Sequence, residues 1–264
     1  MFLNAGGHRL EYIHLHPRGS SAAAAAGQPT LVFLHEGLGS VAMWKNFPAE
    51  VVAATGCPAL VYSRYGYGKS DKLMQAHGVD YMHREALEVL PEVLDQLGIE
   101  APVLIGHSDG ASIALIHTGA GKRPVRGVVA MAPHVFVEDI TVRSIAEAKV
   151  AFQGTDLAGR LGRYHADVVS TFRGWNDIWL HPEFRDWNIE QHLGGIAVPV
   201  LLIQGKDDQY GTRAQVEAIA RQVSGPSQTL MLSKCGHLPH VDQRDSAIEA
   251  IRNFVSGIKG QEPT

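Results

Sequence analysis

Short apolar runs alternate with longer amphipathic stretches along most of the chain. The short runs have the length and the Val, Leu and Ile content of buried strands, and the stretches between them repeat apolar residues at helical spacing. We therefore predict strands at residues 10–16, 30–35, 59–63, 102–107, 127–131, 200–204 and 228–232, and helices at residues 42–54, 82–97, 109–119, 212–222 and 245–256. This alternation is typical of an α/β protein with a mainly parallel sheet and helices on both faces.

Two segments interrupt the alternation. Residues 17–29 are rich in Ser and Ala, and we expect them to form a mobile hairpin loop between early strands. Residues 134–198 separate two predicted strands and are too long for a structureless connection, but they carry helical patterns. We predict that they form a helical insertion that acts as a lid, on a core made of residues 1–133 and 199–264.

Composition and charge narrow the class of protein. The chain has 264 residues, enough for one domain with a large core, and its 23 Lys and Arg against 27 Asp and Glu give a net charge of −4. Without a basic block or a long apolar run, we expect no nucleic-acid or membrane partner and a cytoplasmic protein. The only cysteines, Cys57 and Cys235, are expected to be buried thiols without a disulfide between them. The oligomeric state is not indicated.

The pentapeptide GHSDG at residues 106–110 lies between a predicted strand and a predicted helix. It has the form G-x-S-x-G, in which a serine is held on a sharp turn with its hydroxyl projecting from the sheet edge. The turn brings strand and helix close together, so Gly106 and Gly110 are needed where a side chain would clash. Ser108 is therefore the candidate nucleophile.

The chain resembles the α/β-hydrolase family, and the resemblance spans nearly its whole length. In that family a nucleophile, an acid and a histidine follow one another at the carboxyl ends of strands. The resemblance implies an α/β-hydrolase fold, with Ser108 as nucleophile, Asp208 as orienting acid and His237 as general base. The family's G-x-x-D spacing favours Asp208 over Asp207, and the preceding glycine favours His237 over His240.

These residue types suit acyl transfer. A serine hydroxyl is a weak nucleophile at neutral pH, so an imidazole must take its proton, while a carboxylate holds the imidazole in the right tautomer. The resemblance also implies an oxyanion hole made by the backbone N–H groups of Gly37, which follows the strand at residues 30–35, and of Asp109.

Glu36 departs from the family, which usually has glycine at this position. A carboxylate that faced the developing oxyanion would oppose catalysis, so Glu36 should point away, be protonated or be neutralised. The segment at residues 63–70 resembles the family's D-x-R-G-x-G-x-S segment, with Arg64 one place early. We hypothesise that Arg64 pairs with the Glu36 carboxylate and keeps the two loops together.

Asp109 raises the question of substrate charge. The elbow resembles that of the valacyclovir-hydrolase-like branch, in which the equivalent acid receives the substrate's amino group. If Asp109 faces the cavity, it and Glu36 would favour a cationic or amine-bearing substrate. The alternative is a local role, because a negative side chain is favoured at the start of a helix. Further candidates for the pocket wall are Trp44, His134, Trp175 and Trp179.

The favoured function is hydrolysis of ester or thioester bonds of small molecules through an acyl-enzyme, catalysed by an EC 3.1.1-like carboxylic ester hydrolase. The alternatives are a C–C bond hydrolase of ring-cleavage products and a ligand receptor that keeps the triad without turnover. We expect no cofactor and no metal, because His14 and His16 share a strand face without a third ligand. Chain length and identity of the acyl group are not indicated.

Overall fold

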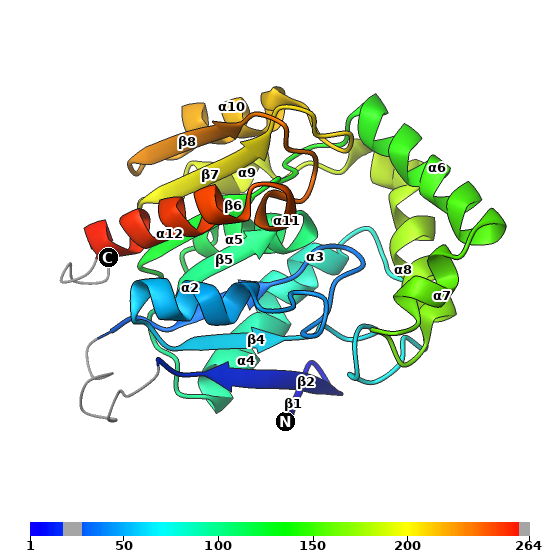
Figure 1. The fold of residues 1–264 in the computed structure, drawn as a ribbon, viewed down its shortest axis with the longest axis horizontal. Helices are drawn as coiled ribbons and strands as arrows, with labels where there is room; N and C mark the ends of the chain where they lie inside the picture. The colour runs from blue at the N-terminus through cyan, green and yellow to red at the C-terminus, as the bar shows by residue number, and fades with distance from the viewer. Residues whose placement is uncertain (18–27, 259–264) are drawn as a thin grey trace.

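The computed structural model describes residues 1–17 and 28–258, and within them the strands form one eight-stranded sheet. The strand order is β1-β2-β4-β3-β5-β6-β7-β8, antiparallel from β1 to β4 and parallel from β4 onward. The predicted α/β architecture with a mainly parallel sheet is confirmed (Figure 1). The strands are β1 (Phe2–Ala5), β2 (His8–Leu15), β3 (Leu31–Leu34), β4 (Ala59–Tyr62), β5 (Val103–His107), β6 (Gly127–Met131), β7 (Val200–Gly205) and β8 (Ser227–Leu232).

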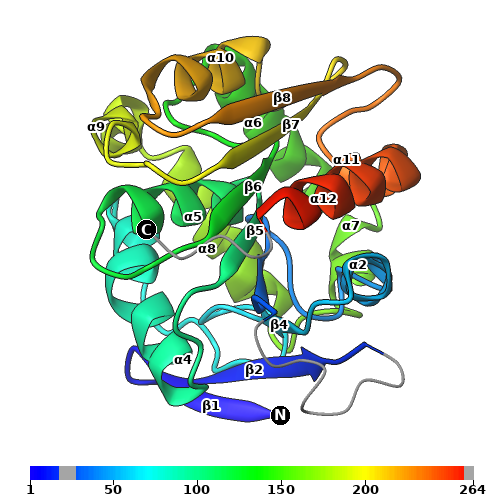
Figure 2. The same cartoon turned by 90° about the vertical axis from the view of Figure 1, so that its left-hand side faces the viewer.

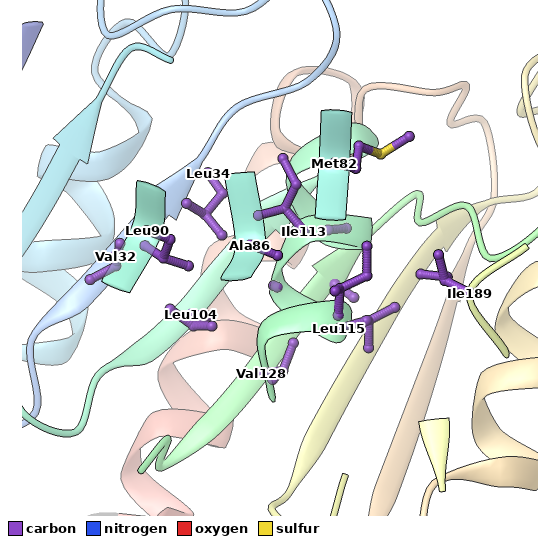
Figure 3. Close-up of a cluster of buried hydrophobic side chains, with 14 of the residues drawn as sticks. Val32, Leu34, Met82, Ala86, Leu90, Leu104, Ile113, Leu115, Val128 and Ile189 are labelled. Carbon is purple, nitrogen blue, oxygen red and sulfur yellow. The ribbon is translucent and has the colours of Figure 1, made fainter. Parts of the chain in front are cut away.

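Helices cover both faces of the sheet (Figure 2). One face is covered by α2 (Phe47–Thr55) and α12 (Arg244–Ile258), and the other by α3 (Tyr81–Arg84), η1 (Glu85–Val89), α4 (Leu90–Gln96), α5 (Asp109–Gly119), α9 (Glu190–Leu193) and α10 (Arg213–Gln222). Side chains alternate along each strand, so Val32 and Leu34 enter one core while Leu31 and Phe33 enter the other. Figure 3 shows the first core, where Val32, Leu104 and Val128 lie beneath Leu90 and Leu115.

The connection between β6 and β7 is largely helical. It contains α6 (Asp139–Gly154), α7 (Leu157–Leu161), α8 (Val168–Trp179), the 3₁₀ turn η2 (Pro182–Asp186) and α9. Figure 1 shows α6, α7 and α8 together beyond one end of the sheet. In contrast, α9 packs against α5 and α10 on the face of the sheet. The helices of this insertion therefore contribute both a separate layer and part of the core.

Local backbone chemistry explains where the elements differ from the prediction. Strand β1 was not predicted; it pairs with β2 through a tight turn at Gly6 and Gly7, both at positive φ. The predicted helix at residues 82–97 is interrupted by a π-helical turn, η1, in which the Leu90 N–H donates to the Glu85 carbonyl. Pro91 follows directly and has no N–H to donate, so the wider turn accommodates it.

The remaining sequence predictions concern a loop, the two cysteines and membrane spans. Most of the predicted loop at residues 17–29 lies outside the described residues. Cys57 and Cys235 are both buried thiols. Within the described part of the chain, none of the helices has the length and hydropathy that a membrane span requires.

Candidate active site

The backbone at Ser108 is a sharp strand-to-helix turn. Ser108 has φ of 52° and ψ of −120°, a region that non-glycine residues rarely occupy, between the end of β5 and the start of α5. A Cβ atom on Gly106 would lie 2.4 Å from the Gly110 carbonyl oxygen, and one on Gly110 would lie 2.0 Å from the Leu34 carbonyl oxygen. Both glycines are thus required by the close approach of backbone segments, as the motif predicted.

Ser108, His237 and Asp208 are brought together in a hydrogen-bonded series. His237 Nε2 lies 2.9 Å from Ser108 Oγ, and His237 Nδ1 lies 2.9 Å from both carboxylate oxygens of Asp208. Because a carboxylate only accepts hydrogen bonds, Nδ1 carries the proton and Nε2 is left to accept from the serine hydroxyl. All three residues are buried. This is the geometry in which an imidazole removes a proton from a serine.

Asp208 is held in place by further donors. Its Oδ1 accepts from the Tyr210 N–H at 2.8 Å and its Oδ2 accepts from Gln204 Nε2 at 2.7 Å. Burial raises the pKa of Asp208, but the hydrogen bond and charge of His237 oppose this and leave the pKa below its usual value. The neighbouring Asp207 is exposed. The carboxylate beside His237 is therefore that of Asp208.

His240, the other histidine considered, belongs to a different cluster. Its ring packs against Trp44 and Phe47, with ring centroids 5.0 and 5.5 Å away. Trp44 was predicted to line the pocket. It is instead buried in the hydrophobic core, with 2% of its surface exposed, and does not reach the cavity. The prediction for Trp44 is wrong because its ring turns toward Phe33 and Phe47 under the sheet.

The two predicted oxyanion donors face the same cavity. Gly37 and Asp109 both line it together with Ser108. The backbone N–H of neither residue donates to another group among the described residues. Asp109 is the first residue of α5, where the N–H has no partner within the helix. Two unpaired N–H groups beside a serine hydroxyl can stabilise a developing oxyanion.

The hypothesis that Arg64 pairs with the Glu36 carboxylate is wrong. The guanidinium donates to the carbonyl oxygens of His35 and Glu36, and Nη2 lies 3.8 Å from Asp109 Oδ2. The side chain of Glu36 turns the other way, with Oε2 3.4 Å from His107 Nδ1. Arg64 thus binds the backbone carbonyl groups of His35 and Glu36. The Glu36 carboxylate is out of its reach because it points in another direction, toward His107.

The Glu36 carboxylate lies beside a histidine instead of the arginine that the sequence suggested. Burial raises the pKa of its carboxyl, but the hydrogen bond and charge of His107, with smaller effects of His240 and His35, hold it well below the usual range. His107 Nε2 also lies 2.7 Å from the His237 carbonyl oxygen. His107 therefore links the loop of Glu36 to the loop of His237. The sequence placed His107 inside the elbow motif but gave no signal of this role.

The cavity above Ser108 has a volume of about 240 Å³. Its walls come from five parts of the chain and are mostly apolar or aromatic. The lining residues are Glu36, Gly37, Leu38, Ser108, Asp109, His134, Thr141, Ile145, Trp175, Trp179, Gln209, Tyr210, His237 and Leu238. The predicted pocket residues other than Trp44 therefore reach the cavity.

The helices between β6 and β7 form part of the cavity wall. A Cβ atom on Gly37 would lie 2.1 Å from Nε1 of Trp175 on α8, so the indole lies directly against the oxyanion loop. The ring of His134 packs edge-on to Trp179 at 5.2 Å between centroids and lies 5.6 Å from the His237 ring. Burial lowers the pKa of His134 to about 3, so this side chain is neutral and extends the apolar wall.

Asp109 lines the cavity, and its side chain is only 1% exposed. Its Oδ2 accepts from the Tyr81 hydroxyl at 2.6 Å, and that hydroxyl accepts from Trp179 Nε1 at 3.1 Å. Burial raises the pKa of Asp109, while the charge of Arg64 opposes the increase. Asp109 Oδ1 is buried and has no hydrogen-bond partner among the described residues. Tyr81 was not predicted, since a tyrosine at a helix start carries no such signal.

Comparison with known proteins places this site in a family. The model of the α/β-hydrolase family matches residues 31–250, so the chain belongs to that family. The predicted α/β-hydrolase fold is confirmed, and the protein is a hydrolase of this class. Similar curated proteins are the proline iminopeptidase of Saccharolobus solfataricus, 22% identical over 86% of this chain and 85% of the relative, and the 2-hydroxy-6-oxononadienedioate/2-hydroxy-6-oxononatrienedioate hydrolase of Klebsiella pneumoniae, 23% identical over 97% and 95%.

Solved structures show the same fold. The enol-lactonase from Burkholderia xenovorans LB400 superposes with a TM-score of 0.74 at 17% identity, covering 97% of this chain and 100% of that one. A structure from a study of carboxylesterases of Nitrososphaera gargenis gives a TM-score of 0.76 at 14% identity, covering 98% of both chains. At these identities the likeness concerns the fold alone.

Proposed function

We propose that the protein is a serine hydrolase that cleaves ester or thioester bonds of small molecules through an acyl-enzyme intermediate. The observation that carries this proposal is the 2.9 Å contact between His237 Nε2 and Ser108 Oγ, in a cavity also lined by Gly37 and Asp109, whose backbone N–H groups have no partner among the described residues. His237 is in turn oriented by Asp208. This combination supplies a nucleophile, a base and an oxyanion hole at one point.

The reaction then takes two steps with the same groups. Ser108 Oγ attacks the substrate carbonyl carbon while His237 Nε2 takes the hydroxyl proton, and the N–H groups of Gly37 and Asp109 stabilise the oxyanion. The carbon–oxygen or carbon–sulfur bond breaks, and His237 donates its proton to the leaving group. A water molecule attacks the acyl-enzyme with His237 again as base, which releases the acid and restores Ser108.

Cavity size and charge limit the substrate. A volume of about 240 Å³ with aromatic walls suits a compact acyl or alcohol group, and we propose that the insertion at residues 134–198 acts as a lid over it. The acidic residues in the lining are Glu36 and Asp109, and the described lining contains no Lys or Arg. An anionic substrate would be repelled by this wall.

The two alternative functions, a C–C bond hydrolase and a non-turnover receptor, place different requirements on the cavity. Relatives are named as hydrolases of 2-hydroxy-6-oxononadienedioate, and a C–C bond hydrolase acting on such a dicarboxylate would need cationic partners. The acidic lining favours ester cleavage over that alternative. A non-turnover receptor would use the same cavity without a reaction.

Steady-state assays test the proposal. We expect sustained multiple turnover of p-nitrophenyl acetate or butyrate, with parallel screening of acyl esters, aminoacyl esters, acyl-CoA thioesters and a dienedioate ring-cleavage product. A single slow burst without turnover would favour the receptor. Cleavage of the dienedioate alone would favour the C–C hydrolase.

An amine-bearing substrate is a second, narrower candidate, which the free Oδ1 of buried Asp109 favours. A substrate ammonium could donate to this atom, and a charge-assisted bond of this kind is worth about 1.5–3 kcal/mol, or roughly 10- to 100-fold in rate. Asp109→Asn should therefore lower kcat/KM by that factor for the p-nitrophenyl ester of valine. The matched 3-methylbutanoate ester lacks the amino group, so its kcat/KM should fall distinctly less. An equal loss on both esters would assign Asp109 a structural role only.

A further inference from the structure

Three nitrogen atoms lie within hydrogen-bond distance of the carbonyl oxygen of Glu36. His35 Nδ1 lies 2.7 Å away, the Gly39 N–H 3.0 Å and Arg64 Nη2 3.1 Å. His35 can donate from Nδ1 because its Nε2 accepts from the Arg64 backbone N–H at 3.0 Å. Burial and the nearby charge of Arg64 lower the pKa of His35, which keeps the ring in this neutral form. The Glu36 carbonyl is thus fixed in direction.

Fixing that carbonyl also fixes the Gly37 N–H. The Glu36–Gly37 peptide is planar, and no cis peptide bonds occur among the described residues, so its N–H points opposite to its carbonyl. The carbonyl is directed at Arg64 and His35, and Gly37 lines the cavity. The Arg64 guanidinium therefore contacts the carbonyl side of this peptide, opposite to the side that carries the Gly37 N–H.

The same guanidinium reaches the second oxyanion donor residue. Arg64 Nη2 lies 3.8 Å from Oδ2 of Asp109, which lines the cavity together with Gly37. Arg64 is only 3% exposed and does not line the cavity. A planar guanidinium with several directed N–H groups can hold two loops at once, which a single ammonium group cannot do with the same geometry.

We infer that Arg64 is a positioning residue for the oxyanion hole, because it orients the Glu36–Gly37 peptide and holds Asp109. This inference rests on the proposed function, since an oxyanion hole has meaning only if Ser108 attacks a carbonyl. Arg64 acts through Gly37 and Asp109 and touches no reacting atom. It therefore contributes to transition-state stabilisation and not to binding of the ground state.

Arg64→Lys tests this role because it keeps the buried positive charge but removes the planar fork. We expect kcat for p-nitrophenyl butyrate to fall about 10- to 100-fold with KM unchanged, somewhat less than the loss of an entire oxyanion donor. The affinity of a trifluoromethyl ketone should fall by the same factor. This inhibitor forms a tetrahedral adduct in which Ser108 Oγ adds to the carbonyl carbon, the oxygen becomes the oxyanion and His237 takes the proton.

Glu85→Gln is the matched control. Glu85 is buried, accepts from the Tyr62 hydroxyl at 2.7 Å and interacts electrostatically with Arg64, and among the described residues its side chain has no hydrogen bond to either oxyanion loop. Its substitution alters the same charge cluster, so kcat and ketone affinity should be retained. An equal loss in Glu85→Gln and Arg64→Lys would show that only the charge cluster matters, and would overturn the inference.

Chemical rescue provides a second measurement. Arg64 also lines a surface crevice of about 530 Å³ with Tyr67, His77 and Tyr81, and we expect a small cation to reach the space left by Arg64→Ala from this crevice. Guanidinium ion at non-denaturing concentration should restore kcat in Arg64→Ala, and methylammonium should restore less.

Unchanged kcat in folded Arg64→Lys, or lost kcat with full ketone affinity, would refute the positioning role. A wild-type protein without turnover would instead refute the proposed function, and this inference with it.

Discussion

Ser108→Ala should lower kcat/KM for p-nitrophenyl butyrate by about 10⁵-fold or more, because no other group can form the acyl-enzyme. Ser108 Oγ is the atom 2.9 Å from His237 Nε2, and the alanine methyl group cannot attack a carbonyl carbon. The fold should persist, because the substitution removes one oxygen and keeps the Cβ atom of the turn. Steady-state kinetics measure the loss, and thermal unfolding confirms that the variant is folded.

The double variant Ser108→Ala/His237→Ala provides the control. His237→Ala should lose nearly all activity alone, since the serine proton then has no acceptor, and the double variant should be no worse than either single one. Additive losses would mean that the two side chains act separately. Activity retained in Ser108→Ala would rule out the mechanism.

Asp208→Asn should lower kcat by about 10⁴-fold, through the tautomer of His237 and not through loss of the fold. Asp208 Oδ1 accepts from the Tyr210 N–H and Oδ2 accepts from Gln204 Nε2, so an amide NH₂ in either position would face a donor. Oδ1 also accepts from the Gly211 N–H, so the amide NH₂ would be directed at His237 Nδ1, which would then become the acceptor and leave the proton on Nε2. A protonated Nε2 cannot receive the serine proton.

Asp207→Asn is the matched control for this substitution. Asp207 is the adjacent carboxylate, is exposed, and only its backbone N–H bonds to the Cys235 carbonyl. Its side-chain substitution should leave kcat unchanged. A comparable loss in both variants would mean that Asp208 has no special role.

The parts of the fold set by local spacing were predictable from sequence. The strand, the G-x-S-x-G turn and helix α5 were predicted, and the helix bounds Asp109–Gly119 match the prediction. Their signals are short-range: apolar runs define the strand, and glycines mark the close approach. Strand β1 was missed because it is short and lies next to a Gly-Gly turn. The π-helical turn depends on how the chain accommodates Pro91, which periodicity does not reveal.

At the candidate site, the directions of side chains in loops were the feature that the sequence could not predict. The sequence identified Ser108, Asp208 and His237 as a set, and the structure brings them within hydrogen-bond distance. Glu36 and Arg64 were correctly placed in neighbouring loops, but opposite charge alone gave the wrong contact. The guanidinium instead binds carbonyl oxygens of the loop, and backbone acceptors leave no trace in the sequence.

Covalent labelling tests the central claim, that Ser108 is the nucleophile, most directly. A fluorophosphonate should react as Ser108 Oγ bonds to phosphorus, fluoride leaves and His237 takes the proton. Mass spectrometry of the digested wild-type protein should locate one phosphonyl group on Ser108, and Ser108→Ala should remain unlabelled. A label on another residue, or equal labelling of Ser108→Ala, would contradict the account.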